Sequence, residues 1–183
     1  MVGFSAGELL GRGSPAPYWP PELADEYQQR QAIRLEHNHA PAREGFESVF
    51  MRKDGRRFPV LIIEAPLINA VGKQTGWMSA FLDISEQRRV EELCIRAAED
   101  ALIEMGITDL APGLLPILGA LQYRTSYGQN VLRHPIECGH IAALLAAELG
   151  LDVEVCRRAA FLHDIGKALT HEAEGSHAKV GAD

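Results

Sequence analysis

The spacing of apolar residues changes near Asp83, and this change limits the chain to a sheet followed by helices. Three short runs of strand-like composition precede Asp83 and are separated by polar turns at 53–56 and 69–72. After Asp83, apolar residues recur at helical spacing. The sequence therefore predicts an α+β fold in two parts, and its 183 residues are enough for two small domains.

The first part is predicted to be an antiparallel meander. Its strands are expected at 46–52, 57–66 and 76–82. Asp54 and Gly55 give a strong hairpin signal, because both positions of a two-residue turn favour positive φ. The proline-rich run 14–21 is predicted to be a loop, and 22–37 a surface helix.

A single long helix is predicted to connect the two parts. It should begin after Asp83, a capping residue with an acid three positions later, and end at Gly106. One face of this helix is apolar and consists of Val90, Leu93, Ala97, Ala101 and Met105. Two interpretations stay open: the face docks on its own domain, or it pairs with a second copy as a dimeric coiled coil.

The chain after Gly106 is predicted to be all-helical. The segment 110–121 contains two prolines and should be short or irregular. Two strong helices are expected at 131–149 and 153–169, where Gly150 stops the first and Asp152 caps the second.

Histidines are concentrated in this helical part, since five of the seven lie at or after His134. His163 and Asp164 are adjacent on the last predicted helix. Consecutive helical residues diverge by about 100°, so two neighbours reach one ion only when the helix passes it edge-on. His134, at the start of the preceding helix, is placed to complete such a site. Lys167, four residues after His163, is expected on the same helix face.

Imidazole and carboxylate groups together suit a divalent cation such as Mg, Mn or Zn. Such an ion lowers the pKa of bound water and so provides a nucleophile for phosphoester hydrolysis. The Lys167 ammonium could neutralise charge on the phosphoryl group. We therefore expect Asp164 and Lys167 to be catalytic and expect His134, His163 and Asp164 to hold the metal.

The C-terminal half resembles the HD domain of bacterial ribonuclease Y, roughly over 97–183. The resemblance is carried by Tyr-Arg-Thr-Ser-Tyr-Gly-Gln-Asn at 123–130 and by Leu-His-Asp-Ile-Gly-Lys-Ala at 162–168. It implies metal-dependent endonucleolytic cleavage of RNA, with His134, His163 and Asp164 as metal ligands.

The same resemblance places His177 where related two-metal HD domains supply a further ligand, whereas His140 and His171 are expected to pack or to face solvent. The chain ends at Asp183, before the later helices that provide the final ligating aspartate in the family. The resemblance therefore implies a truncated domain with an open metal site and reduced or no activity.

The first part resembles the C-terminal half of a PAS sensor domain, as found in bacterial sensor histidine kinases. The residues that carry this resemblance are Phe-Met-Arg-Lys-Asp-Gly-Arg-Arg-Phe-Pro-Val at 50–60 and Asp-Ile-Ser-Glu-Gln-Arg-Arg at 83–89, with Pro-Tyr-Trp-Pro-Pro at 17–21. The first two strands of a PAS sheet have no counterpart, so the resemblance implies an incomplete pocket for an unknown small molecule.

The expected organisation is a partial PAS/PAC-like domain at 1–83, a connecting signalling helix at 84–106 and a truncated HD domain at 107–183. The leading hypothesis is a metal-dependent phosphodiester hydrolase similar to ribonuclease Y, with RNA or another phosphodiester as substrate. The alternative is a non-catalytic PAS-type module for signal sensing or dimerisation, in which the helix at 84–106 mediates a homodimer.

Charge and composition restrict the partners. From Arg96 onward the chain has 7 Lys and Arg against 12 Asp and Glu, and such an acidic surface disfavours a broad grip on a nucleic-acid backbone. The sequence contains neither a secretory signal nor an apolar run of about 20 residues, so a cytoplasmic location is expected. Its three cysteines are expected to be reduced thiols.

Overall fold

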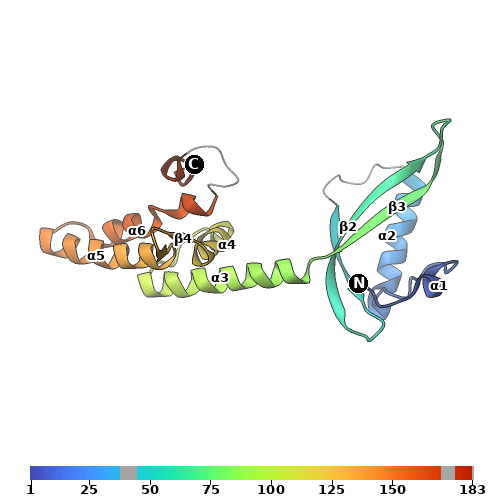
Figure 1. Ribbon diagram of the computed structural model, residues 1–183, viewed down its shortest axis with the longest axis horizontal. Coiled ribbons are helices and arrows are strands. Elements are labelled where there is room, and N and C mark those ends of the chain that lie inside the picture. The colour runs from blue at the N-terminus through green and yellow to red at the C-terminus, as the bar shows by residue number, and fades with distance from the viewer. Residues whose placement is uncertain (38–44, 170–175, 183) are drawn as a thin grey trace. The chain divides into compact units, whose positions relative to one another are not determined.

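The computed structural model describes residues 1–37, 45–169 and 176–182. They form two compact units, Met1–Arg88 and Arg89–Asp183, each with its own cluster of buried apolar side chains. The first unit contains a small antiparallel sheet and the second is mainly helical (Figure 1). This arrangement confirms the predicted combination of sheet and helices.

The first unit is built on a three-stranded sheet. Its elements are α1 (Ala6–Leu9), a 3-10 turn (Pro21–Leu23), α2 (Ala24–His37), β1 (Phe46–Met51), β2 (Arg57–Ile68) and β3 (Gln74–Asp83). The strands pair antiparallel in the order β1-β2-β3, which confirms the predicted meander.

The turn between β1 and β2 differs from the prediction. Gly55 has a φ of 84°, but Asp54 does not have positive φ, so the expectation for both positions was wrong. The Arg52 N–H donates to the Arg56 carbonyl (2.7 Å), and the Gly55 N–H donates to the Arg52 carbonyl (2.9 Å). The strands are thus joined by a longer turn, in which only one residue has to adopt the left-handed conformation.

Apolar side chains on one face of the sheet form the first core. Phe50, Phe58, Val60 and Ile62 are buried and are joined by partly buried neighbours that include Tyr18 and Phe81. Helix α2 is tied to the outer edge of β1, because the Tyr27 hydroxyl donates to the Val49 carbonyl (3.0 Å) and accepts from its N–H (3.2 Å). This contact satisfies backbone groups that an edge strand otherwise leaves to solvent.

Asp83 caps helix α3 (Ser85–Met105), as predicted from the change of spacing. Its Oδ1 accepts hydrogen bonds from the Ser85 N–H (3.0 Å) and from the Ser85 hydroxyl (2.6 Å), while Oδ2 accepts from Arg52 (2.5 Å). The hydrogen bond from the Ser85 hydroxyl is the main cause that lowers the pKa of Asp83, and Arg52 adds to it against the opposing effect of burial.

We expect Asp83→Ala to destabilise the first unit by about 1 kcal/mol at pH 7, because the cap is lost. A lowered folded-state pKa gives stability that is present above the unfolded pKa of about 3.9 and lost as pH falls through the folded pKa. The difference from wild type should therefore shrink at pH 3. Denaturation followed by the fluorescence of Trp19 and Trp77, both in this unit, measures it. Asp83→Asn keeps an acceptor and should recover most of the loss at pH 7 but none of the pH dependence.

The second unit contains the rest of α3 and a set of shorter elements. They are 3-10 turns at Pro112–Leu114, Leu121–Tyr123 and Ile165–Ala168 (the last labelled η4), helices α4 (Leu115–Ala120), α5 (Arg133–Leu149), α6 (Val153–Leu162) and α7 (His177–Val180), and strands β4 (Thr125–Ser126) and β5 (Gln129–Asn130). The prediction of a helical second part is confirmed, except for the short β4–β5 hairpin. The predicted cap of α6 is confirmed, since Asp152 Oδ1 accepts from the Val155 N–H (3.1 Å).

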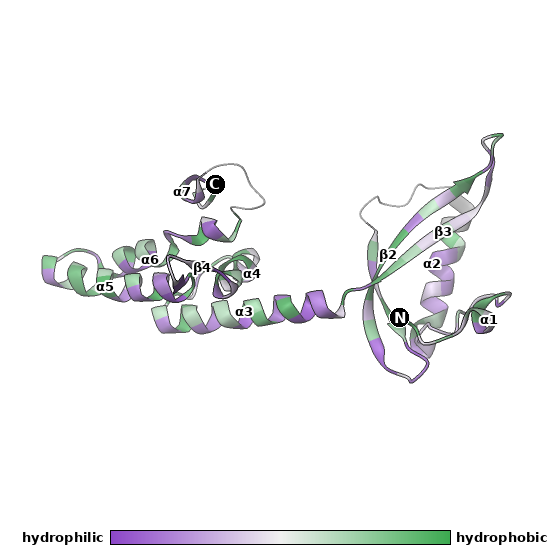
Figure 2. Ribbon diagram, in the orientation of Figure 1, coloured by the Kyte–Doolittle hydropathy of each residue, from purple (hydrophilic) through white to green (hydrophobic). Residues whose placement is uncertain are grey.

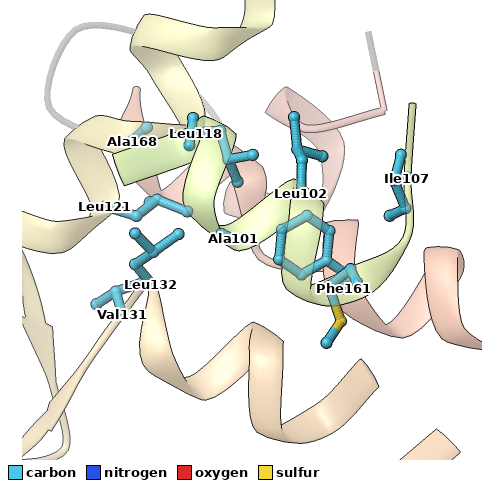
Figure 3. Close-up of a cluster of buried hydrophobic side chains, with 11 residues drawn as sticks. Ala101, Leu102, Ile107, Leu118, Leu121, Val131, Leu132, Phe161 and Ala168 are labelled. Atoms are coloured by element: carbon cyan, nitrogen blue, oxygen red, sulfur yellow. The ribbon is translucent and has the colours of Figure 1, made fainter. Parts of the chain in front are cut away.

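The core of the second unit gathers side chains from elements far apart in the sequence (Figure 3). Ala101 and Leu102 of α3 meet Leu118 of α4, and Phe161 of α6 lies in the same cluster. The C-terminal half of α3 therefore docks on its own domain, as one of the two interpretations proposed. Val90 and Leu93, nearer the start of the helix, are 42% and 45% exposed.

Helices α3 and α4 touch backbone to backbone at Gly119. A Cβ added at this buried glycine would lie 1.7 Å from the Cys94 carbonyl oxygen. The contact is possible because glycine lacks that atom.

The hydropathy colouring of Figure 2 shows green and purple residues mixed along the helices of both units. Across 1–37, 45–169 and 176–182, no helix combines the length and the apolar character needed to cross a membrane.

Candidate metal centre

The candidate site lies where α6 ends. The prediction of one helix over 153–169 was wrong, because α6 stops at Leu162 and η4 starts at Ile165. His163 still has helical dihedrals (φ −57°, ψ −27°), whereas Asp164 leaves them (φ −107°, ψ 7°). A continuous helix would have to pass the ion edge-on for both side chains to reach it. Because the backbone leaves the helical conformation at Asp164, the two side chains can point to one position without that geometry. This break in the helix also means that Lys167 does not share a continuous helix face with His163.

Three predicted ligands meet at this break. One ligand atom each from His134, His163 and Asp164 lies within 4.8 Å of the others, which makes a possible metal site in the described part of the chain. Asp164 Oδ2 is 3.2 Å from His163 Nε2 and 3.8 Å from His134 Nε2. The two imidazole rings lie edge to face, with centroids 5.4 Å apart.

A backbone carbonyl orients His163. Its Nδ1 lies 2.7 Å from the Ala160 oxygen, and a carbonyl can only accept, so Nδ1 must carry the hydrogen. In the neutral imidazole, the form that binds a metal, the lone pair is then on Nε2, the atom that faces Asp164. Hydrogen bonds of this kind fix the tautomer of metal-binding histidines.

His134 is held by the start of α5. Asn130 Oδ1 accepts from the N–H groups of Leu132 (3.0 Å) and Arg133 (3.1 Å) and so caps the helix. Pro135 lies in the first turn of α5, where its missing N–H costs nothing. The position of His134 is thus set by a fixed helix end.

Cys138 lies one turn after His134, with its Sγ 3.6 Å from His134 Nε2. Burial, together with the negative charge of Asp164, raises the pKa of this thiol. Cys138 is therefore a neutral neighbour of the histidine at physiological pH. The spacing of four residues between His134 and Cys138, within a predicted helix, was the available signal for this contact.

Asp164 is only 3% exposed and lies against the Lys167 ammonium and the imidazoles of His163 and His177. Burial acts to raise its pKa, but the hydrogen bond from Lys167 and the charges of His163 and His177 outweigh burial and lower it. Lys167 Nζ lies 2.6 Å from Oδ2. The carboxylate is therefore anionic at neutral pH, which is the state that a divalent cation requires.

His177 approaches the other side of the same carboxylate. Its Nε2 is 3.7 Å from Asp164 Oδ1, and it lies outside the cluster of three. Helix α7 can come this close because η4 has no side chain at Gly166, where a Cβ would lie 1.9 Å from the His177 carbonyl oxygen. His140 instead contacts Glu104 (3.0 Å), and His171 lies outside the described residues.

Arg124 links the hairpin to the site, and sequence reasoning assigned it no role. Its guanidinium donates to the carbonyls of Lys167 (2.9 Å) and Ala168 (2.6 Å). The only available signal was its presence in the distinctive 123–130 motif. This contact fixes η4, and with it Lys167, against the β4–β5 hairpin.

Two imidazole nitrogens and an anionic carboxylate oxygen form a donor set that fits a divalent cation. Residues 131–183 match the family model for the HD domain, a range that includes His134, His163, Asp164 and His177. HD domains generally depend on a metal, which agrees with this set of ligands.

More particular similarity is to ribonuclease Y. The ribonuclease Y of Salinispora tropica is 65% identical over 101 residues, which cover 55% of this chain and 17% of that protein. The ribonuclease Y of Thermobifida fusca is 61% identical over 98 residues, which cover 54% and 20%. The aligned part of the chain thus spans a fifth or less of the length of these relatives.

Among solved structures, the chain is similar to the one titled "Crystal structure of the Vibrio cholera VqmA-Ligand-DNA complex". The match covers 85% of this chain and 73% of that one, with 18% identity and a TM-score of 0.33. Similarity at this level does not establish a shared fold.

Proposed function

We propose that the second unit is a metal-dependent phosphodiester hydrolase of the HD superfamily that cleaves RNA, as its ribonuclease Y relatives are named to do. The observation that carries the proposal is the convergence of His134, His163 and the buried Asp164 on one point. The identity of the metal, whether Mg, Mn or Zn, stays open.

The three residues would hold the ion, each in a role that its surroundings favour. His163 presents Nε2 because its Nδ1 is bound to Ala160, and Asp164 supplies negative charge. When bound, the ion would supply an acidified water and neutralise charge on the phosphate. We propose His177 as a further ligand from the Oδ1 side of Asp164.

Lys167 is proposed to stabilise charge that develops on the phosphoryl group. Its ammonium lies 2.6 Å from Asp164 Oδ2, so it already stands at the edge of the site. The carbonyl of Lys167 accepts from Arg124, which fixes the backbone from which the Lys167 side chain extends.

A second candidate function concerns the first unit. We propose that it is a PAS-like sensor, with 1–83 as the sensor, 84–106 as a signalling helix and 107–183 as the HD part. A cavity of about 110 Å³ supports this candidate and is lined by aromatic side chains together with Arg30 and Glu64. The sequence predicted an incomplete pocket, and the ligand stays unknown. Exposed Val90 and Leu93 are the residues through which a homodimer would form.

Metal removal tests the proposed function. The purified chain should cleave a fluorescent single-stranded oligoribonucleotide when Mn²⁺ or Mg²⁺ is added, stop when EDTA is added, and recover when the metal is restored. Calorimetric titration should detect binding of the same ion. If a folded chain binds no ion and leaves the RNA intact, the hydrolase proposal fails and the sensor candidate remains.

A further inference from the structure

The β4–β5 hairpin carries a tyrosine that the fold does not require. Ser126 pairs with Gln129, so Tyr127 and Gly128 form a two-residue turn with φ values of 51° and 80°. Tyr127 is the one residue other than glycine with positive φ in the described ranges. Such turns prefer Asn-Gly, and a tyrosine there is conformationally strained. Residues held in strained conformations are concentrated at functional sites.

The ring of Tyr127 does not contribute to either core. Tyr127 is 104% exposed, so its position at the tip is explained neither by burial nor by turn preference. Exposed, flat aromatic side chains are the groups on which single-stranded nucleic acids stack their bases.

The hairpin is held in a fixed position beside the metal centre. Arg124, at its base, is bonded to the carbonyls of Lys167 and Ala168, and its own carbonyl accepts from the Val131 N–H (3.0 Å). Asn130, at the other end, donates to the Gln122 carbonyl (2.6 Å) while it caps α5. The turn at Tyr127 and Gly128 is therefore held in place by hydrogen bonds at both ends of the hairpin.

Tyr127 and the metal centre border the same hollow. A cavity of about 80 Å³ is lined by Ser126, Tyr127, Gln129, Val131, His134 and Lys167. A second hollow of about 310 Å³ is also bordered by His134 and by Gly128, Gln129 and Asn130 of the hairpin. A phosphate at His134 and Lys167 would therefore have the hairpin tip as its neighbour.

The charge of the chain also favours binding through bases. From Arg96 onward there are 7 Lys and Arg against 12 Asp and Glu, so the surface offers little to hold a long phosphate backbone. Stacking on an aromatic ring contributes affinity without positive charge and with little preference for sequence.

We propose that Tyr127 forms a nucleobase subsite, on which the base next to the scissile phosphate of a single-stranded RNA stacks. This inference rests on the proposed function and adds to it a residue that positions the substrate. It predicts an affinity that depends only weakly on salt, because few phosphates are neutralised.

The test is binding of a labelled single-stranded oligoribonucleotide to the full chain in EDTA, which separates binding from cleavage. Tyr127→Ala should weaken binding roughly tenfold, whereas Tyr127→Trp should retain it. Tyr127→Asn should also weaken binding but raise the melting temperature by about 4 °C, because asparagine tolerates this turn. Tyr123→Ala is the matched control, since Tyr123 is 59% exposed and does not line the cavity.

A second binding experiment uses an oligomer that has the same sugar-phosphate backbone but no bases. Wild type and Tyr127→Ala should bind it equally. Equal binding of the base-containing RNA by both proteins overturns the subsite even if wild type cleaves with Mn²⁺. If Tyr127→Ala loses base-dependent binding but wild type does not cleave the RNA, the subsite is supported and the hydrolase proposal is overturned. A wild type that binds no RNA in EDTA overturns the subsite, and cleavage with Mn²⁺ then decides the hydrolase proposal separately.

Discussion

Replacing Asp164 with asparagine is expected to lower kcat/KM for metal-dependent RNA cleavage by at least about 10³-fold. The carboxylate is the shared partner of His134, His163, Lys167 and His177, and an amide of the same shape removes its negative charge. Binding of Mn²⁺, measured by calorimetry, should weaken in parallel. The Lys167 ammonium would also lose its anionic partner.

The matched control for this variant is His140→Ala. His140 lies on the same helix as His134 but contacts Glu104 instead of the cluster, so activity should stay within about twofold of wild type. Circular dichroism of both variants checks that the fold is retained. If folded Asp164→Asn kept a tenth or more of wild-type activity, Asp164 could not be a ligand of the catalytic metal.

The second large effect is expected from Gly119→Ala. The new Cβ would lie 1.7 Å from the Cys94 carbonyl oxygen and 2.7 Å from the Cys94 Cα, and both are backbone atoms that cannot rotate away. Helices α3 and α4 must therefore separate, which opens the core around Leu118 and Leu102. We expect the second unit to lose about 3 kcal/mol or more of stability.

Hydrogen exchange along the C-terminal half of α3 measures this effect, because it reports on the second unit alone. Gly113→Ala is the control, since a Cβ at Gly113 would meet nothing within 4 Å. That variant should be as stable as wild type or slightly more stable. Unchanged exchange in Gly119→Ala would show that the two helices do not touch at this glycine.

Much of the architecture could be predicted from local chemistry. The Asp54-Gly55 pair indicated the first hairpin, and Asp83 and Asp152 indicated helix starts, because turns and caps depend on a few neighbouring residues. The three candidate ligands, which lie within 4.8 Å of one another, were also predicted, from the adjacent pair His163-Asp164 and from His134 at the start of the preceding helix.

The break after Leu162 could not be predicted from periodicity alone. Apolar residues continue at helical spacing through Ile165 and Leu169, so the pattern favours an unbroken helix. Gly166 was the available signal, because glycine weakens a helix and permits close backbone approach. Its role depends on α7, which is distant in the sequence and packs on η4.

The β4–β5 hairpin could not be predicted for a different reason. Its strands have two residues each, too short for an alternating pattern to be recognised. Arg124 and Asn130 hold it in place through side-chain bonds to backbone groups of other segments. Such bonds have no periodic signature in a sequence.

If His163 binds an ion as proposed, its hydrogen bond to the Ala160 carbonyl makes the affinity for that ion depend on one helical turn. Ala160 belongs to the last turn of α6, the kind of segment that frays at a small fraction of the global unfolding free energy. When that turn opens, the imidazole regains its rotational freedom and an ion at the site loses a ligand. A bound ion would, by the same linkage, hold the end of α6 closed.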